Sequence, residues 1–313
     1  HLGNMPEDVL ESRPEMVVLW AGYAFSRDYS APRGHMYTIE DVTHTLRTGT
    51  PDHEHKDMQP STCWACKSPD VPRMMHEVGI ENFYKASWSQ FGSEIVNPVG
   101  CADCHDPKTM NLTITRPALI EAFERQGKDI TKATPQEMRS LVCAQCHVEY
   151  FFKGDGKYLT FPWDGGMTVE SMEEYYDNAN YTDWVHHLSK APMLKAQHPD
   201  YEIFLLGPHA QRGLSCADCH MPYMSEGGIK YSNHQVMSPL KNVSSTCQTC
   251  HRDSEENLKN YVYQYQDKAL EIRNRIEVEL AKAHVMAKAA WDNGADEAKM
   301  KESLKLIRQA QWR

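Results

Sequence analysis

The sequence repeats one five-residue pattern: Cys63-Trp64-Ala65-Cys66-Lys67, Cys101-Ala102-Asp103-Cys104-His105, Cys143-Ala144-Gln145-Cys146-His147, Cys216-Ala217-Asp218-Cys219-His220 and Cys247-Gln248-Thr249-Cys250-His251. All ten cysteines belong to these motifs, and histidine follows the second cysteine in four of them. Two thiols at this spacing form thioethers with one porphyrin, and the next residue then lies beneath the iron as an axial ligand. The chain is therefore predicted to carry five covalently attached haem c groups.

Three other uses of paired cysteines explain the pattern less well. Zinc sites use CxxC pairs but do not require a histidine directly after the second cysteine. A redox-active CxxC usually occurs once, near a βαβ pattern that is not apparent in this sequence. A disulfide framework does not repeat one local spacing in every motif. Covalent haem attachment accounts for every cysteine.

The composition limits the classes of partner and the location. Asp and Glu (43 residues) outnumber Lys and Arg (33 residues), so the basic surface that nucleic acid binding needs is not expected. The longest apolar run, about Met16 to Phe25, is shorter than the roughly 20 residues of a membrane-spanning helix. No nucleic acid partner and no transmembrane segment of the chain's own are predicted. Because haem is attached to cysteine outside the bacterial cytoplasm, a periplasmic location is expected.

The first motif differs from the others, since Lys67 stands where they have histidine. A lysine amine binds iron only when deprotonated, so the site must desolvate Lys67 or let the metal displace its proton. Simple electron transfer is well served by two strong axial ligands and gives no reason for a lysine. The alternative is an incidental replacement, with a histidine reaching in from elsewhere. The Lys67 haem is the candidate catalytic centre.

The sequence changes character after the last motif. Apolar residues recur in steps of three and four, which predicts a long amphipathic helix from Asp253 or Ser254 to about Asn293-Gly294. Its apolar positions are Leu258, Val262, Tyr265, Ala269, Ile272, Ile276, Leu280, Ala283, Ala287 and Ala290. Such a stripe is usually a core or helix-pairing face, whereas His284 on the same helix is interpreted as structural. A second helix is predicted from about Asp296, and residues 154–166 are a candidate short hairpin.

The predicted fold is mainly α, with helices and loops wrapped around five haems, long C-terminal helices and very little β structure. Residues 1–251 form the predicted haem-binding catalytic region. Residues 252–313 form the long-helix region. Together they are expected to be one functional domain.

The chain also resembles the catalytic subunit of the pentahaem ammonia-forming cytochrome c nitrite reductases. One CxxCK motif followed by four CxxCH motifs is close to diagnostic of that family. Further matching segments lie at 18–23 (VLWAGY), 25–29 (FSRDY), 32–35 (PRGH), 45–49 (TLRTG), 63–69, 143–150 and 192–199. The resemblance covers nearly the whole chain.

The distal haem ligands can be assigned only through this resemblance. Outside the motifs, the candidates after His1 are His35, His44, His53, His55, His76, His186, His187, His198, His209, His234 and His284. The resemblance implies His234 for the second haem, His35 for the third and His209 for the fifth. It puts the distal ligand of the fourth haem beyond Arg313, so the sequence is expected to lack the family's C-terminal segment.

The resemblance also implies the chemistry at Lys67. Arg47, Tyr150 and His198 match the family's distal residues, and the implied reaction is six-electron reduction of nitrite to ammonium. Each of them has an ordinary alternative role: a solvated cation for Arg47, haem packing for Tyr150 and a turn or core residue for His198. The other four haems would feed electrons to the Lys67 haem. Hydroxylamine, nitric oxide and sulfite are expected further substrates, and the alternative function is electron transfer without catalysis.

Three further features follow from the same resemblance. Calcium is expected beside the active haem, held by the Glu149 carboxylate, the carbonyls of Tyr150 and Lys195 and the Gln197 side chain, which are hard oxygen donors of the kind Ca²⁺ prefers. The C-terminal helices are expected to form a homodimer interface. The electron donor is expected to be a membrane quinol-oxidising cytochrome or a soluble periplasmic one.

Overall fold

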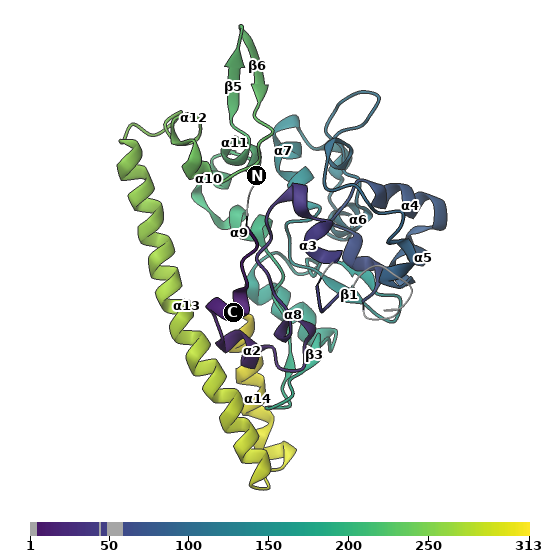
Figure 1. The fold of residues 1–313 in the computed structure, drawn as a ribbon, viewed down its shortest axis with the longest axis vertical. Coiled ribbons are helices and arrows are strands. Elements are labelled where there is room, and N and C mark those ends of the chain that lie inside the picture. Colours follow the sequence, from purple (N-terminus) through teal and green to yellow (C-terminus); the bar gives the residue numbers. More distant parts are fainter. Residues whose placement is uncertain (1–4, 44, 49–58) are drawn as a thin grey trace.

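A computed structural model describes residues 5–43, 45–48 and 59–313, and these residues form a mainly α fold (Figure 1). The α-helices are α1 (Val9–Ser12), α2 (Glu15–Leu19), α3 (Glu40–Thr43), α4 (Asp70–Val78), α5 (Ile80–Lys85), α6 (Pro117–Arg125), α7 (Pro135–Ala144), α8 (Val169–Asn178), α9 (Asp200–Leu206), α10 (Pro208–Gln211), α11 (Cys216–His220), α12 (Val243–Thr246), α13 (Glu255–Asp292) and α14 (Glu297–Trp312). Single 3₁₀ turns are η1 (Ala24–Ser26), η2 (His35–Tyr37), η4 (Ser61–Trp64), η5 (Trp88–Phe91), η6 (Cys101–Asp103), η7 (Ile130–Lys132) and η8 (Pro239–Lys241).

The strands within the described residues form only two-stranded antiparallel pairs. These pairs are β1 (Phe151–Lys153) with β2 (Tyr158–Thr160), β3 (Trp184–Val185) with β4 (Pro192–Met193), and β5 (Tyr223–Glu226) with β6 (Ile229–Ser232). The first pair confirms the short hairpin predicted around residues 154–166, with Phe151 opposite Thr160. The predicted fold class, mainly α with very little β, is confirmed.

The long C-terminal helix begins and ends where its capping residues predict. The Ser254 hydroxyl accepts a hydrogen bond from the Asn257 N–H at 3.2 Å, which satisfies a donor of the first turn of α13. At the other end Gly294 has a φ of 82°, a left-handed conformation that glycine adopts without Cβ strain. The next helix, α14, starts after Asp296, whose carboxylate accepts from the Lys299 N–H at 2.9 Å. Both helix predictions are confirmed.

The apolar stripe of α13 is only partly buried within this chain. Its C-terminal half packs against α2 and α14, where Leu280 and Ala287 join a core with Met16 and Ile307. Midway along the helix, Tyr265 is 80% exposed, and Ile272 and Ile276 are each 46% exposed. Figure 1 shows α13 running along one side of the molecule, with α14 folded back beside its end. The stripe is therefore a core face in its C-terminal half, while Tyr265, Ile272 and Ile276 lie outside the cores of this chain.

A second, larger core lies under the first motif. Trp64 of that motif stacks on Trp88 with ring centroids 3.4 Å apart, and the Trp64 indole N–H donates to the Trp88 carbonyl at 3.0 Å. Phe83, Leu119 and Trp163 are buried in the same cluster. Burial of large aromatic side chains is the main stabilising contribution of such a core. It fixes the backbone that carries Lys67.

No helix in the described part of the chain is long and apolar enough to cross a membrane.

Two stacked histidines join the long helix to the β3–β4 turn. The rings of His186 and His284 lie 3.6 Å apart between centroids. His186 Nε2 donates to the Val18 carbonyl at 2.7 Å, and its Nδ1 accepts from the N–H groups of Leu188 and Ser189 at 3.2 Å. His284 contacts Ser189 Oγ at 2.9 Å and Gln311 Oε1 at 3.0 Å. His284 is thus placed in a structural junction, as its position in the sequence suggested.

Acid is expected to destabilise this junction. Burial, and to a smaller extent the charge on His284, lowers the pKa of His186 from 6.5 to about 4. A proton on Nδ1 would in addition face the N–H groups of Leu188 and Ser189. Since the folded-state pKa lies below the unfolded one, the stabilisation is complete above pH 6.5 and is lost as the pH falls toward 4. We expect the loss to be about 3 kcal/mol.

Melting curves of the haem-loaded protein across this pH range test the prediction. The melting temperature of His186→Gln should fall less steeply with acid than that of the parent protein. The exposed His76 on α4 supplies the control, since His76→Gln should keep the parent slope. Equal slopes for His186→Gln and the parent would show that the junction does not titrate.

Candidate functional site: the five motifs and the Lys67 pocket

Each of the five motifs lies on or beside a short helical turn. The N–H of the residue after the second cysteine reaches back to the carbonyl of the first at His105 (2.8 Å), His147 (2.9 Å) and His251 (2.9 Å). In the first motif the Lys67 N–H donates to the Trp64 carbonyl at 2.9 Å. Because residues three and four apart share one face of a helix, this turn puts both thiols and the axial residue on one side. The local sequence alone produces this arrangement.

The thiols are in the state that haem attachment requires. None of the ten cysteines, all within the described residues, forms a disulfide, and each is at least partly accessible. The first and third motifs touch, because the thiols of Cys66 and Cys146 are hydrogen-bonded. That contact, followed by burial, raises the pKa of Cys146. Cys143 makes the same kind of contact with Cys216 of the fourth motif. The motifs therefore form a contiguous series.

Three motif histidines face a second histidine from a distant part of the chain. The ring centroids of His105 and His234 are 6.1 Å apart, those of His147 and His35 are 6.2 Å apart, and those of His251 and His209 are 6.2 Å apart. A metal–imidazole bond is about 2 Å long, and the bonding nitrogen lies roughly 1 Å from the centre of its ring. Two imidazoles on opposite sides of one metal therefore have ring centroids about 6 Å apart. The described residues thus fit three haem irons with two histidine ligands each.

The motif histidines are oriented through their other ring nitrogen. His105 Nδ1 contacts the Met110 carbonyl at 2.7 Å, and His220 Nδ1 contacts the Met237 carbonyl at 3.0 Å. His147 Nδ1 instead pairs with the Asp200 carboxylate at 3.0 Å. Such partners fix the ring orientation and raise the basicity of a metal-binding imidazole, a carboxylate more strongly than a carbonyl. Our sequence reasoning missed Asp200, although it follows His198 by only two positions.

Tyr150 and His198 lie together beside the first motif. Their ring centroids are 5.5 Å apart, and His198 is also 6.0 Å from His147. Burial, with smaller contributions from the charges on His147 and Lys67, lowers the pKa of His198 to about 4. Burial raises the pKa of Tyr150 well above its ordinary value, with added contributions from Cys66 and Cys63. The structure therefore brings two predicted catalytic residues to the Lys67 motif.

Positive charge also gathers at this place. The Arg47 guanidinium lies 4.5 Å from the centroid of the Phe25 ring, and Lys195 Nζ lies 4.8 Å from the same centroid. Arg47 also donates to the Asp28 carbonyl at 3.2 Å. Burial raises the pKa of the nearby Cys63 thiol to about 12, and the positive charges of Lys67 and Arg47 oppose this rise. Cations and hydrogen-bond donors gathered in this way suit a small anion.

A buried carboxylate, that of Glu149, lies next to these cations. Glu149 is fully buried. It accepts from the Tyr176 hydroxyl at 2.8 Å and from the Gln197 N–H at 2.6 Å. Burial raises the pKa of Glu149 to about 8. Lys195 Nζ donates to Gln197 Oε1 at 2.9 Å, so a cation already sits against one of the predicted calcium ligands. The donor set of Glu149 and Gln197 oxygens fits a hard cation.

The side chain of Lys195 makes a contact that the resemblance did not imply. The resemblance assigned calcium binding to its carbonyl alone, whereas its ammonium group also contacts Gln197. No group of three or more His, Cys, Asp or Glu side chains among the described residues is arranged to hold a metal ion. A calcium site here would combine a single carboxylate with carbonyl and amide oxygens, so it would not form an acidic cluster. The candidate histidines His44, His53 and His55 lie outside the described residues, as does Gly49 of the matching segment 45–49.

The comparisons with known proteins agree with this architecture. The chain matches the cytochrome c552 family over residues 1–313. It is 71% identical over 311 residues to cytochrome c-552 of Parabacteroides distasonis and 70% identical over 311 residues to that of Bacteroides thetaiotaomicron. Each alignment covers 99% of this chain and 63% of the relative, so the chain spans less than two thirds of the length of these relatives.

A solved structure shows the same fold. It is the catalytic subunit of cytochrome c nitrite reductase from Desulfovibrio desulfuricans, which is described with two calcium sites. The two structures superpose with a TM-score of 0.89 at 36% identity, covering 96% of this chain and 67% of that one. With the whole-chain family match, these comparisons show that the chain belongs to the cytochrome c552 family, whose members carry haem c.

Proposed function

We propose that this chain is the haem-bearing part of a nitrite reductase that converts nitrite to ammonium at a lysine-ligated haem. The observation that carries the proposal is the contrast between motifs. Three histidine motifs face a second histidine at 6.1–6.2 Å, as electron-transfer haems require. The Lys67 motif is instead accompanied by Tyr150, His198 and the Arg47 charge.

The ten cysteines would hold five haems, each through two thioethers. Lys67, His105, His147, His220 and His251 would be the ligands supplied by the motifs. His234, His35 and His209 would complete the second, third and fifth sites, as their facing rings support. The bound iron supplies the redox chemistry, and the protein supplies ligation, electrostatic field and protons.

The side chains around Lys67 have distinct proposed roles. Arg47 attracts and orients the anion through charge-assisted hydrogen bonds. His198 and Tyr150 donate hydrogen bonds to the nitrite oxygens and pass on the protons that N–O cleavage consumes. Six electrons and eight protons convert one nitrite into ammonium and two water molecules. Hydroxylamine, nitric oxide and sulfite are small enough to be further substrates of such a pocket.

Calcium would bind beside the active haem. The Glu149 carboxylate, the Gln197 amide oxygen and the carbonyls of Tyr150 and Lys195 are the proposed ligands. Tyr150 and Lys195 belong to the two segments that carry or precede the catalytic groups, so the ion would hold these segments together. The calcium sites of the Desulfovibrio desulfuricans relative support this assignment.

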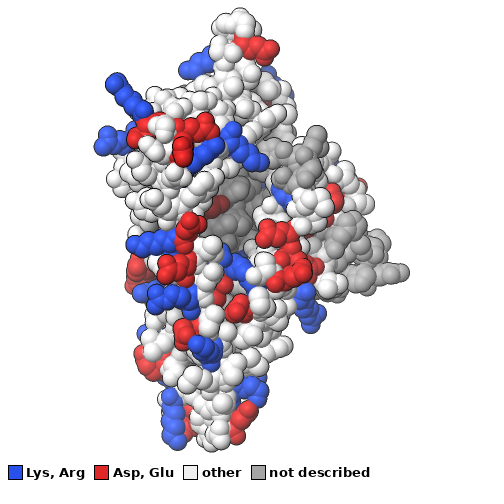
Figure 2. Space-filling model, turned by 60° about the vertical axis from the view of Figure 1, so that its left-hand side comes forward, with Lys and Arg blue, Asp and Glu red and all other residues white. Residues whose placement is uncertain are grey.

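The long helix suggests how two copies would associate. Helix α13 carries an exposed apolar strip made of Tyr265, Ile272 and Ile276. Ion pairs lie on the helix before and after this strip, at Lys259–Glu255 and at Lys282–Glu279. Figure 2 shows acidic and basic side chains interspersed over this side of the molecule. A homodimer through α13 would bury the strip, and residues 252–313 would then serve the catalytic region 1–251 as its dimerisation element. The proposed location is the periplasm, with a quinol-oxidising or soluble cytochrome as electron donor.

The proposal is tested by the ammonium formed per nitrite consumed. The haem-loaded protein would be reduced with a viologen dye under anaerobic conditions, and both ions would be assayed over time. We expect one ammonium for each nitrite. If the haems became reduced while nitrite was untouched, the protein would be an electron-transfer cytochrome without catalysis.

A further inference from the structure

The first three motifs meet at one buried arginine, Arg116. Its side chain is 1% exposed and pairs with the 5% exposed carboxylate of Asp103 at 2.5 Å. It also donates from Nε to the Ala65 carbonyl at 2.6 Å and from Nη2 to the Ser68 carbonyl at 2.8 Å. Asp103 belongs to the second motif, and Ala65 and Ser68 enclose Lys67 in the first. One guanidinium therefore links two motifs.

The third motif is tied to the same arginine through Gln145. The Gln145 amide oxygen accepts from the backbone N–H of Arg116 at 3.2 Å, and its amide nitrogen donates to the Asp103 carbonyl at 2.6 Å. Gln145 is 1% exposed, so water does not compete for these bonds. Thr115 adds a hydroxyl that accepts from Arg116 Nη1 at 2.5 Å. The variable positions of the second and third CxxC motifs are thus used to build this junction.

The sequence around Arg116 holds its backbone in the required conformation. Pro117 follows directly and begins α6, and a residue before proline is restricted to extended conformations. Arg116 has φ −106° and ψ 117°, within that region. A planar guanidinium with five fixed donors can bind two carbonyls and a carboxylate at once, which a lysine ammonium on a flexible stem cannot reproduce.

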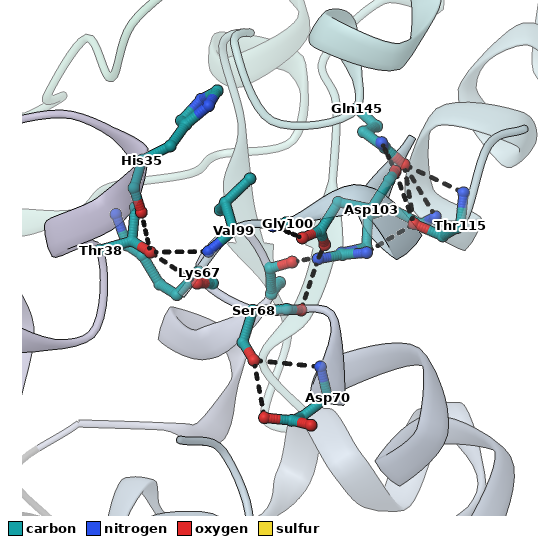
Figure 3. Close-up of polar contacts among 12 residues, drawn as sticks. His35, Thr38, Lys67, Ser68, Asp70, Val99, Gly100, Asp103, Thr115 and Gln145 are labelled. Carbon is teal, nitrogen blue, oxygen red and sulfur yellow. Dashed lines mark hydrogen bonds and ion pairs between the residues drawn. The ribbon is translucent and has the colours of Figure 1, made fainter. Parts of the chain in front are cut away.

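Thr38 holds the other side of the Lys67 peptide. Its hydroxyl lies 2.8 Å from the Lys67 carbonyl oxygen and 3.0 Å from that of His35, and it accepts from the Val99 N–H at 3.2 Å. His35 faces the third motif, and Val99 precedes the second by two residues. Figure 3 shows Thr38 between His35, Lys67 and Val99. The contacts of Thr38 and Arg116 together confine the peptide that carries Lys67.

We propose that Arg116 is a positioning residue whose side chain sets the spacing of the first two haem attachment points and the orientation of Lys67. This inference rests on the proposed haem assignment of these motifs. The hydrogen bonds of the Arg116 side chain go to Ala65, Ser68, Asp103 and Thr115, so its influence on nitrite reduction is exerted through the motifs. Reactions between fixed groups are sensitive to displacements of 1 Å, and the loss of such a junction is expected to cost about 10- to 100-fold in rate.

The fourth motif supplies a matched control. The second and fourth motifs share the sequence CADCH. In the fourth, Asp218 pairs with Arg139 at 3.3 Å, just as Asp103 of the second pairs with Arg116. Both aspartates also accept the N–H three residues before them, from Gly100 at 2.8 Å and from Ser215 at 2.7 Å. The remaining side-chain bond of Arg139 goes to Ser232 in β6 at 3.0 Å. Arg139→Lys therefore changes an Asp–Arg pair of the same design at a different place.

The experiment compares haem-loaded Arg116→Lys and Arg139→Lys with the parent. The readouts are the haem count by mass spectrometry, the optical and paramagnetic resonance spectra of the lysine-ligated haem, the reduction potentials by spectroelectrochemical titration, and kcat and KM for nitrite. For Arg116→Lys we expect the parent haem count, an altered spectrum of the lysine-ligated haem and shifted potentials. Its kcat should fall about 10- to 100-fold while KM stays within about twofold. Arg139→Lys should keep the parent spectrum and kcat.

Identical spectra and potentials in Arg116→Lys and Arg139→Lys would overturn the proposal. If Arg116→Lys yields no haem-loaded protein, Asp103→Asn takes its place, because it keeps the side-chain volume and the bond from Gly100 while weakening the pair with Arg116. Parent-like spectra and potentials in that variant would likewise refute the positioning role. A parent protein that makes no ammonium would count against the proposed function alone, because the spectra and potentials still report on Arg116.

Discussion

Replacing His198 with Asn is expected to lower nitrite turnover by about two to four orders of magnitude, the range that a positioned proton donor contributes. His198 lies 5.5 Å from Tyr150 between ring centroids and is brought beside the Lys67 motif by the segment before α9. Asparagine keeps a hydrogen-bond donor of similar reach but cannot exchange a proton at neutral pH. Binding of nitrite should therefore suffer less than its conversion, so kcat should fall more than KM rises.

The measurement is anaerobic nitrite consumption by the haem-loaded variant, with its haem count confirmed first. His76→Asn is the matched control, because His76 is an exposed histidine on α4. It should retain the activity of the parent protein. Parent-like turnover in His198→Asn would remove His198 from the catalytic group and would weaken the proposed function as a whole.

Replacing Glu149 with Gln is expected to abolish calcium binding and to lower both stability and turnover. The Glu149 carboxylate accepts from the Tyr176 hydroxyl at 2.8 Å and the Gln197 N–H at 2.6 Å. A glutamine amide would set its own N–H₂ group against one of these donors, and a buried donor left without an acceptor costs about 1–3 kcal/mol. It would also remove the only carboxylate among the proposed calcium ligands. Because Gln197 directly precedes His198 in the chain, we expect His198 to be held less firmly beside the Lys67 motif.

Calcium content by elemental analysis, the melting temperature and the turnover number test this prediction together. We expect the calcium content of the variant to fall to background and its turnover to fall about tenfold, in line with the effect of misplacing a catalytic group. Glu173 on α8 is the control, because it is also a buried glutamate, 4% exposed, but pairs with Arg313 at 2.7 Å. Glu173→Gln should keep the parent calcium content. Unchanged calcium in Glu149→Gln would mean that any bound ion lies elsewhere.

Local features of the fold were predictable because they depend on neighbours in the chain. The CxxC spacing places two thiols and the next residue on one face of a single turn. The caps at Ser254 and Asp296 determine where the two C-terminal helices begin, and the hairpin of β1 and β2 arises from the glycine-rich turn between them. The four-to-one split between histidine and lysine motifs also pointed to one haem with a different task.

Contacts between distant segments could not be derived from such patterns. His35 and His147 are separated by more than a hundred positions, and only the family resemblance suggested that they face each other. The Arg116 junction was not predicted at all, because an isolated arginine in a sequence is most often a solvated charge. The repeated aspartate of the two CADCH motifs was the one available hint. The stripe of α13 indicated an apolar face, but periodicity alone does not say which part of that face lies in the core of this chain.

The sequence by itself determined the local geometry of five CxxC turns, one of them followed by lysine, and of two capped helices after them. These depend on spacings of three to five residues, which a helical turn converts directly into geometry. The tertiary structure decided which histidines face which motifs, how Arg116 and Thr38 enclose Lys67, and how Glu149 meets Gln197. Those arrangements depend on the packing of two cores and on buried hydrogen bonds between segments far apart in the chain, and no local pattern specifies them.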